Sequence, residues 1–111
     1  MKDDTVYLEH ILEAIRKIES YLTDVSFESF CQDDMRLDAV VRELEIIGEA
    51  SRNLSEVFQN DHREIPFREI TDMRNILIHK YFGINIKMVW DTCVTDIPIL
   101  KEDIQKLLPE V

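Results

Sequence analysis

The sequence predicts an all-α fold, an antiparallel bundle of four long helices plus a short connecting helix. Only two of the 111 residues are glycine and three are proline, so residues that interrupt helices are scarce. Long stretches rich in leucine, isoleucine, glutamate, lysine and arginine lie between them. Their apolar residues recur at intervals of three and four, the spacing of one helix face. The length suits a single domain covering residues 1–111.

The first half of the chain predicts two long helices. The first covers residues 4–22, and Asp3 and Asp4 suit its positively polarised N-terminal end. Residues 24–31 form a connector, with a short helical turn after Ser26. The second helix is predicted over residues 34–58. The apolar stripes of the two helices are Leu8, Ile11, Leu12, Ile15, Ile18 and Leu22, and then Leu37, Val41, Leu44, Ile47, Ala50, Leu54 and Phe58.

The second half predicts two more helices. Pro66 fits the first turn of a third helix, where its missing N–H is not needed, and this helix runs to position 80 or 81 and stops near Gly83. Asn85 can cap a fourth helix. Pro98 should kink that helix near Val94, because it removes a backbone hydrogen bond there. The apolar rhythm of the fourth helix consists of Ile86, Trp90, Cys93, Ile97, Leu100, Ile104 and Leu107.

The charge of the chain is strongly negative but unevenly distributed. A formal net charge of −10 argues against a generic nucleic-acid binder, because cations drive contact with phosphates. Residues 62–90 differ, because five lysines and arginines outnumber three acidic residues there and give a net charge of +2. The remainder of the chain therefore carries −12. Residues 74–85 therefore lie in the one mildly basic part of an acidic protein.

Cysteine usage and hydropathy suggest the compartment. Cys31 and Cys93 lack the spacing of a disulfide framework or a metal site, so we expect buried structural thiols. No apolar run approaches the roughly 18 residues that a membrane span needs, and the chain start has no signal-peptide core. We therefore expect a cytoplasmic protein that does not enter the membrane.

The third predicted helix places a cation inside an apolar stripe. An arginine there needs an anionic partner or a wet cleft, because desolvating an unpaired charge is unfavourable. Glu45 and Glu49, on one face of the second predicted helix, are candidate structural partners. The stripe is Phe67, Ile70, Arg74, Leu77 and Tyr81.

Arg74 and His79 are candidate catalytic residues, but they point in different directions from the same predicted helix. They lie five residues apart, about 140° around an ideal helix, so one copy can use both on a single atom only awkwardly. Two copies across a twofold axis could place both in one cleft. Asn75 shares a face with His79. From spacing alone, a salt-bridged arginine and an ordinary histidine remain an alternative. His10 and His62 are interpreted as surface residues, and the histidine spacing predicts no metal site.

The segment RNILIHKY, residues 74–81, resembles the signature of HEPN-domain ribonucleases. The pattern is arginine, four residues, histidine, one residue and tyrosine, with a polar residue directly after the arginine. The form that ends in tyrosine is similar to that of the HepT-like toxins. Three longer segments resemble the second, third and fourth helices of that family: LEIIGEASRNLSE (44–56), IPFREITDMRNILIHKYFGIN (65–85) and VWDTCVTDIPILKEDI (89–104).

The resemblance implies an all-helical homodimer in which Arg74 and His79 of both chains line a shared cleft. The implied activity is metal-independent endoribonuclease cleavage, in which a ribose 2′-hydroxyl attacks the adjacent phosphate. Arg74 would stabilise the charge that builds on the phosphate, and His79 would move protons. Asn75, Lys80 and Tyr81 would support RNA binding, with Asn75 orienting the imidazole or holding a phosphate oxygen and Tyr81 stacking on a base or donating to phosphate.

The resemblance also implies regulation by a partner. HepT-like toxins of type VII toxin–antitoxin systems are paired with an MntA-type nucleotidyltransferase antitoxin, which would transfer AMP groups from ATP to Tyr81. Adenylate groups beside Arg74 and His79 would block the cleft and neutralise its positive potential. The antitoxin would need ATP and Mg²⁺, whereas this chain would need no cofactor.

Two other functions stay open. In the first, the chain is a non-catalytic helical module that binds and assists a nucleotidyltransferase, and Arg74 pairs structurally with Glu45 or Glu49. In the second, the chain is a nucleotide-binding regulator.

Overall fold

The computed structural model describes residues 2–79 and 83–108, except for the side chains at positions 2, 3, 78 and 79. All regular structure in these ranges is helical, which confirms the predicted fold class. Its elements are α1 (Lys2–Leu22), α2 (Phe27–Cys31), α3 (Asp34–Asn53), α4 (Glu56–Asp61), α5 (Phe67–His79), α6 (Ile86–Asp91), the π-helical segment η2 (Thr92–Asp96) and α7 (Ile97–Leu107).

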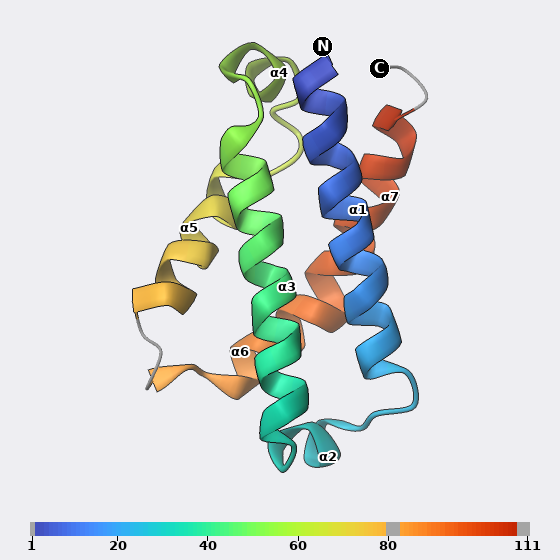
Figure 1. The fold of residues 1–111 in the computed structure, drawn as a ribbon, viewed down its shortest axis with the longest axis vertical. Helices are drawn as coiled ribbons and strands as arrows, with labels where there is room; N and C mark the ends of the chain where they lie inside the picture. Colours follow the sequence, from blue (N-terminus) through green and yellow to red (C-terminus); the bar gives the residue numbers. More distant parts are fainter. Residues whose placement is uncertain (1, 80–82, 109–111) are drawn as a thin grey trace.

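The long helices form the predicted antiparallel bundle (Figure 1). α3 is central: it packs against α1 on one side and α5 on the other, while α7 returns beside α1. The predicted apolar stripes of α1 and α3 are buried, apart from the partly exposed Leu22 and Leu37. The fully buried side chains include Leu8, Ile11, Ile15, Leu44, Ile47, Phe67, Leu77 and Ile104.

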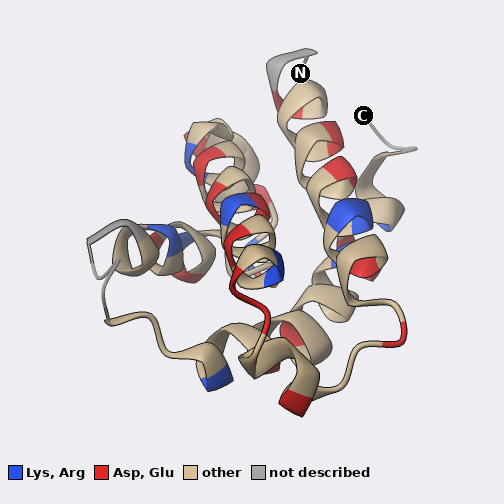
Figure 2. Cartoon of the chain, turned by 60° about the horizontal axis from the view of Figure 1, so that its bottom comes forward, with Lys and Arg blue, Asp and Glu red and all other residues tan. Residues whose placement is uncertain are grey.

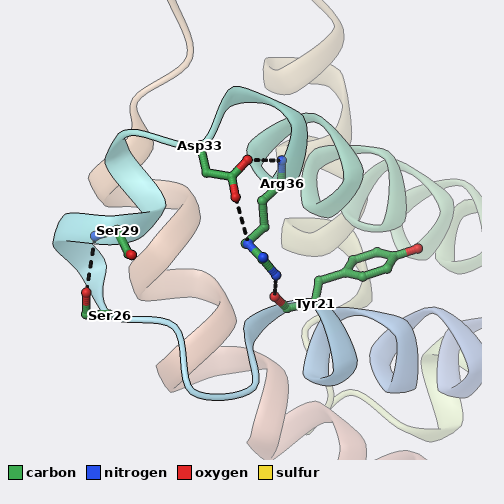
Figure 3. A network of polar contacts seen from close by, with 5 residues as sticks. All are labelled: Tyr21, Ser26, Ser29, Asp33 and Arg36. Carbon is green, nitrogen blue, oxygen red and sulfur yellow. Dashed lines mark hydrogen bonds and ion pairs between the residues drawn. The ribbon is translucent and has the colours of Figure 1, made fainter.

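The chain between α1 and α3 is held by local caps (Figure 3). The Ser26 hydroxyl accepts the Ser29 N–H at the start of α2, where a helical turn is predicted. Asp33 caps α3 by accepting the Arg36 N–H at 3.0 Å and Arg36 Nε at 3.1 Å. These bonds lower the pKa of Asp33, mainly through the backbone bond. Arg36 Nη1 donates to the Tyr21 carbonyl, which ties the start of α3 to the end of α1.

The continuous helix predicted over residues 34–58 is wrong. The chain leaves the helix at Leu54, whose φ of −61° and ψ of 143° are extended. Ser55 then caps α4 by accepting the Phe58 N–H at 3.1 Å. The Ser55 N–H and hydroxyl also donate to the carboxylate of Asp4, which is buried, at 2.7 and 2.8 Å. These two bonds to α1 compensate for the break, which divides the predicted helix into the long α3 and the short α4.

The predicted kink in the fourth helix is confirmed as a π-helical segment. Asn85 caps α6 by accepting the Met88 N–H at 3.1 Å, as predicted. The helix widens in η2 and returns to α-helical geometry in α7, where Pro98 lies in the first turn. Proline has no N–H to bond the carbonyl of Val94, and a π-helical segment accommodates such a gap without ending the helix.

The prediction for the cysteines is half right. Cys93 is buried, but Cys31 is exposed at the end of α2. None of the described helices is both long and apolar enough to span a bilayer. Acidic positions are spread along α1 and α3 rather than gathered in one segment (Figure 2).

Candidate functional site

Arg74 lies where α5 comes closest to α3. Gly48 is buried in α3, and a Cβ added to it would overlap the Arg74 Cβ and lie 3.2 Å from the Ile70 carbonyl oxygen. A side chain at position 48 would therefore push the two helices apart. This close approach brings the base of the Arg74 side chain directly against α3.

Arg74 pairs with Glu49, one of its two predicted partners. Its Nη2 lies 3.1 Å from Glu49 Oε2, whereas no ion pair forms with Glu45. The approach lacks the alignment of a hydrogen bond, and within the described residues Glu49 Oε2 is buried and accepts none. Arg74 Nη1 donates to Asn75 Oδ1 at 3.3 Å, a long bond. The guanidinium is thus charge-paired, but its N–H donors are poorly used.

Glu49 itself is anchored by neighbours on α3. Its Oε1 accepts from Asn53 Nδ2 at 3.4 Å, and Arg52 Nη1 lies 3.8 Å from Oε2. Two arginines therefore approach one carboxylate, so the group carries a net positive charge. Arg52 and Arg74 together can attract an anionic ligand such as a phosphodiester.

A polar cleft of about 210 Å³ opens beside the Arg74–Glu49 pair, between α1, α3 and α5. Most of the residues that line it are polar or charged, and the apolar ones are Ile46 and Ala50. The side chains that give it this character are Tyr7, His10, Arg42, Glu45, Glu49 and Arg74. A cleft with this mixture can place cations, acceptors and rings around a charged ligand.

The structure brings some of the predicted site residues together. Arg74 and Asn75 are adjacent and in contact. His79 ends α5, but its side chain lies outside the described residues, as do Lys80 and Tyr81. In the described part of the chain, no group of three or more histidine, cysteine or acidic residues is arranged to hold a metal ion.

The surface interpretation is confirmed for His10 and only partly right for His62. His10 is exposed, as predicted, but it also lines the cleft. His62 is partly buried: its ring lies 4.5 Å from that of Phe58, and its Nδ1 lies 3.4 Å from Glu64 Oε1. Its packing against an apolar ring explains why position 62 is not a simple surface site.

Sequence reasoning missed Gly48, Tyr7 and Arg42. Gly48 had a readable signal, because a glycine inside a helical pattern marks a close backbone approach. Tyr7 and Arg42 had none, since Tyr7 falls outside the predicted apolar stripe and Arg42 is one of many polar residues of its helix. Only the packing of α1 against α3 brings them to the same cleft.

Comparison with known proteins assigns the chain to a family. The family model described as Ribonuclease HepT-like matches residues 11–107. The protein is therefore a ribonuclease by class. The chain belongs to the HepT-like ribonuclease family.

Individual relatives agree with this family. A protein of Thermococcus cleftensis named "Probable ribonuclease HepT" is 48% identical, over 91% of this chain and 92% of its own. A Caldanaerobacter subterraneus subsp. tengcongensis protein named "Putative RNase" is 42% identical, over 97% and 96%. A Methanocaldococcus jannaschii protein named "Gamma-glutamylcyclotransferase and putative RNase" is 44% identical over 99% of this chain, which spans only 50% of that relative. No solved structure matches the chain.

Proposed function

We propose that the protein is the toxin of a type VII toxin–antitoxin system and acts as a metal-independent endoribonuclease in the cytoplasm. The observation that carries the proposal is Arg74, which lies in a polar cleft in a chain of a ribonuclease family. Names of relatives such as "Probable ribonuclease HepT" agree with the reaction class. RNA is the proposed substrate, because its 2′-hydroxyl supplies the nucleophile without water or a metal ion.

The proposed reaction is an internal transesterification. A bond forms between the ribose 2′-oxygen and phosphorus, and the bond between phosphorus and the 5′-oxygen breaks. The His79 imidazole takes the proton of the attacking hydroxyl and then gives that proton to the leaving 5′-oxygen. The products are a 2′,3′-cyclic phosphate and a free 5′-hydroxyl, so atoms and charge balance without a co-reactant.

Arg74 suits the role of stabilising the phosphate. Its guanidinium stays charged and presents parallel donors to phosphate oxygens. The side chain is 24% exposed, and its contact with Glu49 lacks hydrogen-bond alignment, so donors remain for a ligand. Donors fixed before the reaction stabilise charge as it develops in the transition state.

We further propose that the complete site forms in a homodimer. Because Arg74 and His79 are five residues apart on α5, an ideal helix directs them about 140° apart. A second copy across a twofold axis supplies the complementary residue to each cleft. Asn75, Lys80 and Tyr81 would then line the same cleft and hold the RNA.

Cleavage of a labelled single-stranded RNA tests the catalytic assignment. Arg74→Ala and His79→Ala should each lower the rate by about a hundredfold or more, as the loss of a transition-state donor does. Arg68→Ala is the matched control, because Arg68 is an exposed arginine of α5 outside the cleft and should retain the wild-type rate. Wild-type cleavage by both active-site variants would overturn the assignment.

The proposed neutralisation is AMPylation of Tyr81 by a nucleotidyltransferase antitoxin. Bulky anionic groups beside Arg74 would occupy the cleft and compete with the phosphate of RNA. Intact-mass spectrometry after coexpression with the antitoxin should show added AMP on the wild type and none on Tyr81→Phe. Neutralisation of Tyr81→Phe with no mass change would contradict this mechanism.

The Arg74–Glu49 pair also favours a second candidate function. A non-catalytic module that binds and assists a nucleotidyltransferase would keep Arg74 only for this contact. An ion pair between partly exposed groups contributes at most about 1 kcal/mol, which is a few degrees of melting temperature. An inactive wild-type protein, together with a fall of a few degrees in the melting temperature of Arg74→Ala, would favour this second function.

A further inference from the structure

The cleft beside Arg74 has a second part that the proposed chemistry does not use. Tyr7 and His10 lie three residues apart on one face of α1, and Arg42 and Glu45 lie three apart on the facing side of α3. All four side chains line the same cleft as Arg74. A ring pair, a cation and a carboxylate therefore converge on one small volume.

Arg42 is available for a ligand. It is exposed, and it makes no ion pair or side-chain hydrogen bond with any described residue. This differs from Arg74, whose guanidinium faces Glu49. A free guanidinium on the same cleft can take a second phosphate of the strand bound at Arg74.

Tyr7 and His10 form an aromatic surface in the cleft. Their ring centroids are 6.2 Å apart, with the planes at 84°, an edge-to-face pair. Tyr7 is partly buried and holds its position in the core, whereas His10 is exposed. The exposed imidazole face is open to stacking with a nucleobase, which is the usual way that proteins hold unpaired bases.

We infer that Tyr7, His10 and Arg42 form a subsite for one nucleotide of single-stranded RNA, next to the nucleotide whose phosphate is bound by Arg74. The inference rests on the proposed function for the phosphate at Arg74. Arg42 binds the phosphate of the neighbouring nucleotide, and its base stacks on His10. The cleft has a volume of about 210 Å³, below the range of most pockets for drug-sized ligands, so it leaves room for no more than one nucleotide.

The groove beyond His10 does not suit a second nucleotide. It continues into a hollow of about 170 Å³ that is lined by Glu13, Lys17 and Glu43. Lys17 Nζ lies 3.9 Å from Glu13, so its charge is balanced and Glu43 remains in excess. Repulsion of phosphate by these carboxylates limits the subsite to a single nucleotide.

Glu45 gives the subsite a base preference. Its carboxylate repels phosphate, but it accepts hydrogen bonds from amino groups such as the exocyclic amines of adenine, cytosine and guanine. Uracil has no exocyclic amine, and its one donor on that edge, the ring N3–H, lies between two carbonyl oxygens that the carboxylate repels. The subsite therefore prefers adenosine, cytidine or guanosine to uridine.

Binding of labelled oligo(A) and oligo(U) to the full chain tests this subsite. All variants are built on His79→Ala so that the RNA stays intact, and fluorescence anisotropy gives the affinities. Arg42→Ala and His10→Ala should each weaken oligo(A) binding. The stacking lost in His10→Ala corresponds to about fivefold to a hundredfold. His10→Phe should retain it, since phenylalanine still stacks. Arg16→Ala, an exposed arginine of α1 outside the cleft, should bind like the parent.

The outcomes separate the subsite from the catalytic proposal. Weakened binding by Arg42→Ala and His10→Ala supports the subsite even if the wild-type protein cleaves no RNA. Parental binding by both variants overturns the subsite, while cleavage by the wild type would leave the catalytic proposal intact. Equal affinity for oligo(A) and oligo(U), unchanged in Glu45→Ala, overturns the base preference. If the His79→Ala parent binds no RNA and the wild-type protein cleaves none, both proposals are overturned.

Discussion

At the scale of single residues, Arg74 is held in place by its neighbours but keeps guanidinium donors free for a ligand. Close packing on Gly48 holds the base of its side chain, and Glu49 balances its charge at 3.1 Å. The guanidinium donors are poorly used, because the contact with Glu49 lacks hydrogen-bond alignment and the bond to Asn75 is 3.3 Å long. A phosphate that approaches the cleft therefore meets a fixed cation with free N–H groups.

The two cysteines should differ sharply in reactivity. Cys31 is exposed, whereas burial raises the pKa of Cys93 from 9.0 to about 12. Only the thiolate reacts with a disulfide reagent such as DTNB. At pH 8 one thiol of the native protein should react quickly, and the second should react only on unfolding. The Cys31→Ser variant should show no fast phase; rapid reaction of both thiols would contradict the buried position of Cys93.

The raised pKa of Cys93 also predicts a dependence of stability on pH. The folded state keeps the Cys93 proton between pH 9 and about 12, whereas the unfolded state releases it. The free energy of unfolding should thus fall in that window by at most about 1.4 kcal/mol per pH unit from this thiol, and be unaffected below it. Denaturant melts at pH 8 and 10 should show a smaller fall in Cys93→Ala. Equal falls in the two proteins would contradict this assignment.

At the scale of helices, the contact of α5 with α3 positions the site. Gly48→Ala should gain about 1 kcal/mol of helix propensity, but the added methyl overlaps the Arg74 Cβ and overpacking destabilises by about 1–3 kcal/mol. We expect a net loss of stability and slower RNA cleavage, because α5 must shift. Gly83→Ala is the control for thermal melting, since a Cβ there meets nothing within 4 Å. A more stable, fully active Gly48→Ala would contradict the role of this contact.

The helices also show what local sequence can and cannot predict. Caps at Ser26 and Asn85 and the irregularity before Pro98 follow from short-range chemistry, and all three were predictable. The break at Leu54 was not, because the apolar stripe continues to Phe58 with helical spacing. It depends on Ser55 bonding a buried carboxylate 51 positions earlier in the chain.

The candidate site, like the helices, could be predicted only in part from the sequence. Glu49 was a predicted partner of Arg74 because the residue types and their helices were readable from the sequence. That His10 and Arg42 line the cleft could not be predicted from the sequence, because it depends on how α1 and α3 are rotated against each other. Side-chain positions at His79 and Tyr81 lie outside the described residues, so their roles remain predictions.

At the scale of the whole molecule, the proposed dimer predicts complementation between inactive variants. If each cleft combines Arg74 of one copy with His79 of the other, a mixture of Arg74→Ala and His79→Ala should regain activity on subunit exchange. A mixed dimer of these variants keeps one intact pair across its twofold axis. The cleavage rate after unfolding and refolding the two together measures this. No recovery, with mixed dimers confirmed by native mass spectrometry, would contradict a shared cleft.

The central claim is metal-independent ribonuclease chemistry at Arg74, and the ends of the cleaved RNA test it most directly. Cleavage by the wild-type protein in EDTA, followed by mass spectrometry of the fragments, should give 2′,3′-cyclic phosphate and 5′-hydroxyl ends at the rate seen without EDTA. The same reaction with Arg74→Ala should give almost no fragments, while Arg68→Ala should match the wild type. Fragments with 5′-phosphate ends, cleavage that EDTA abolishes, or wild-type cleavage by Arg74→Ala would contradict the claim.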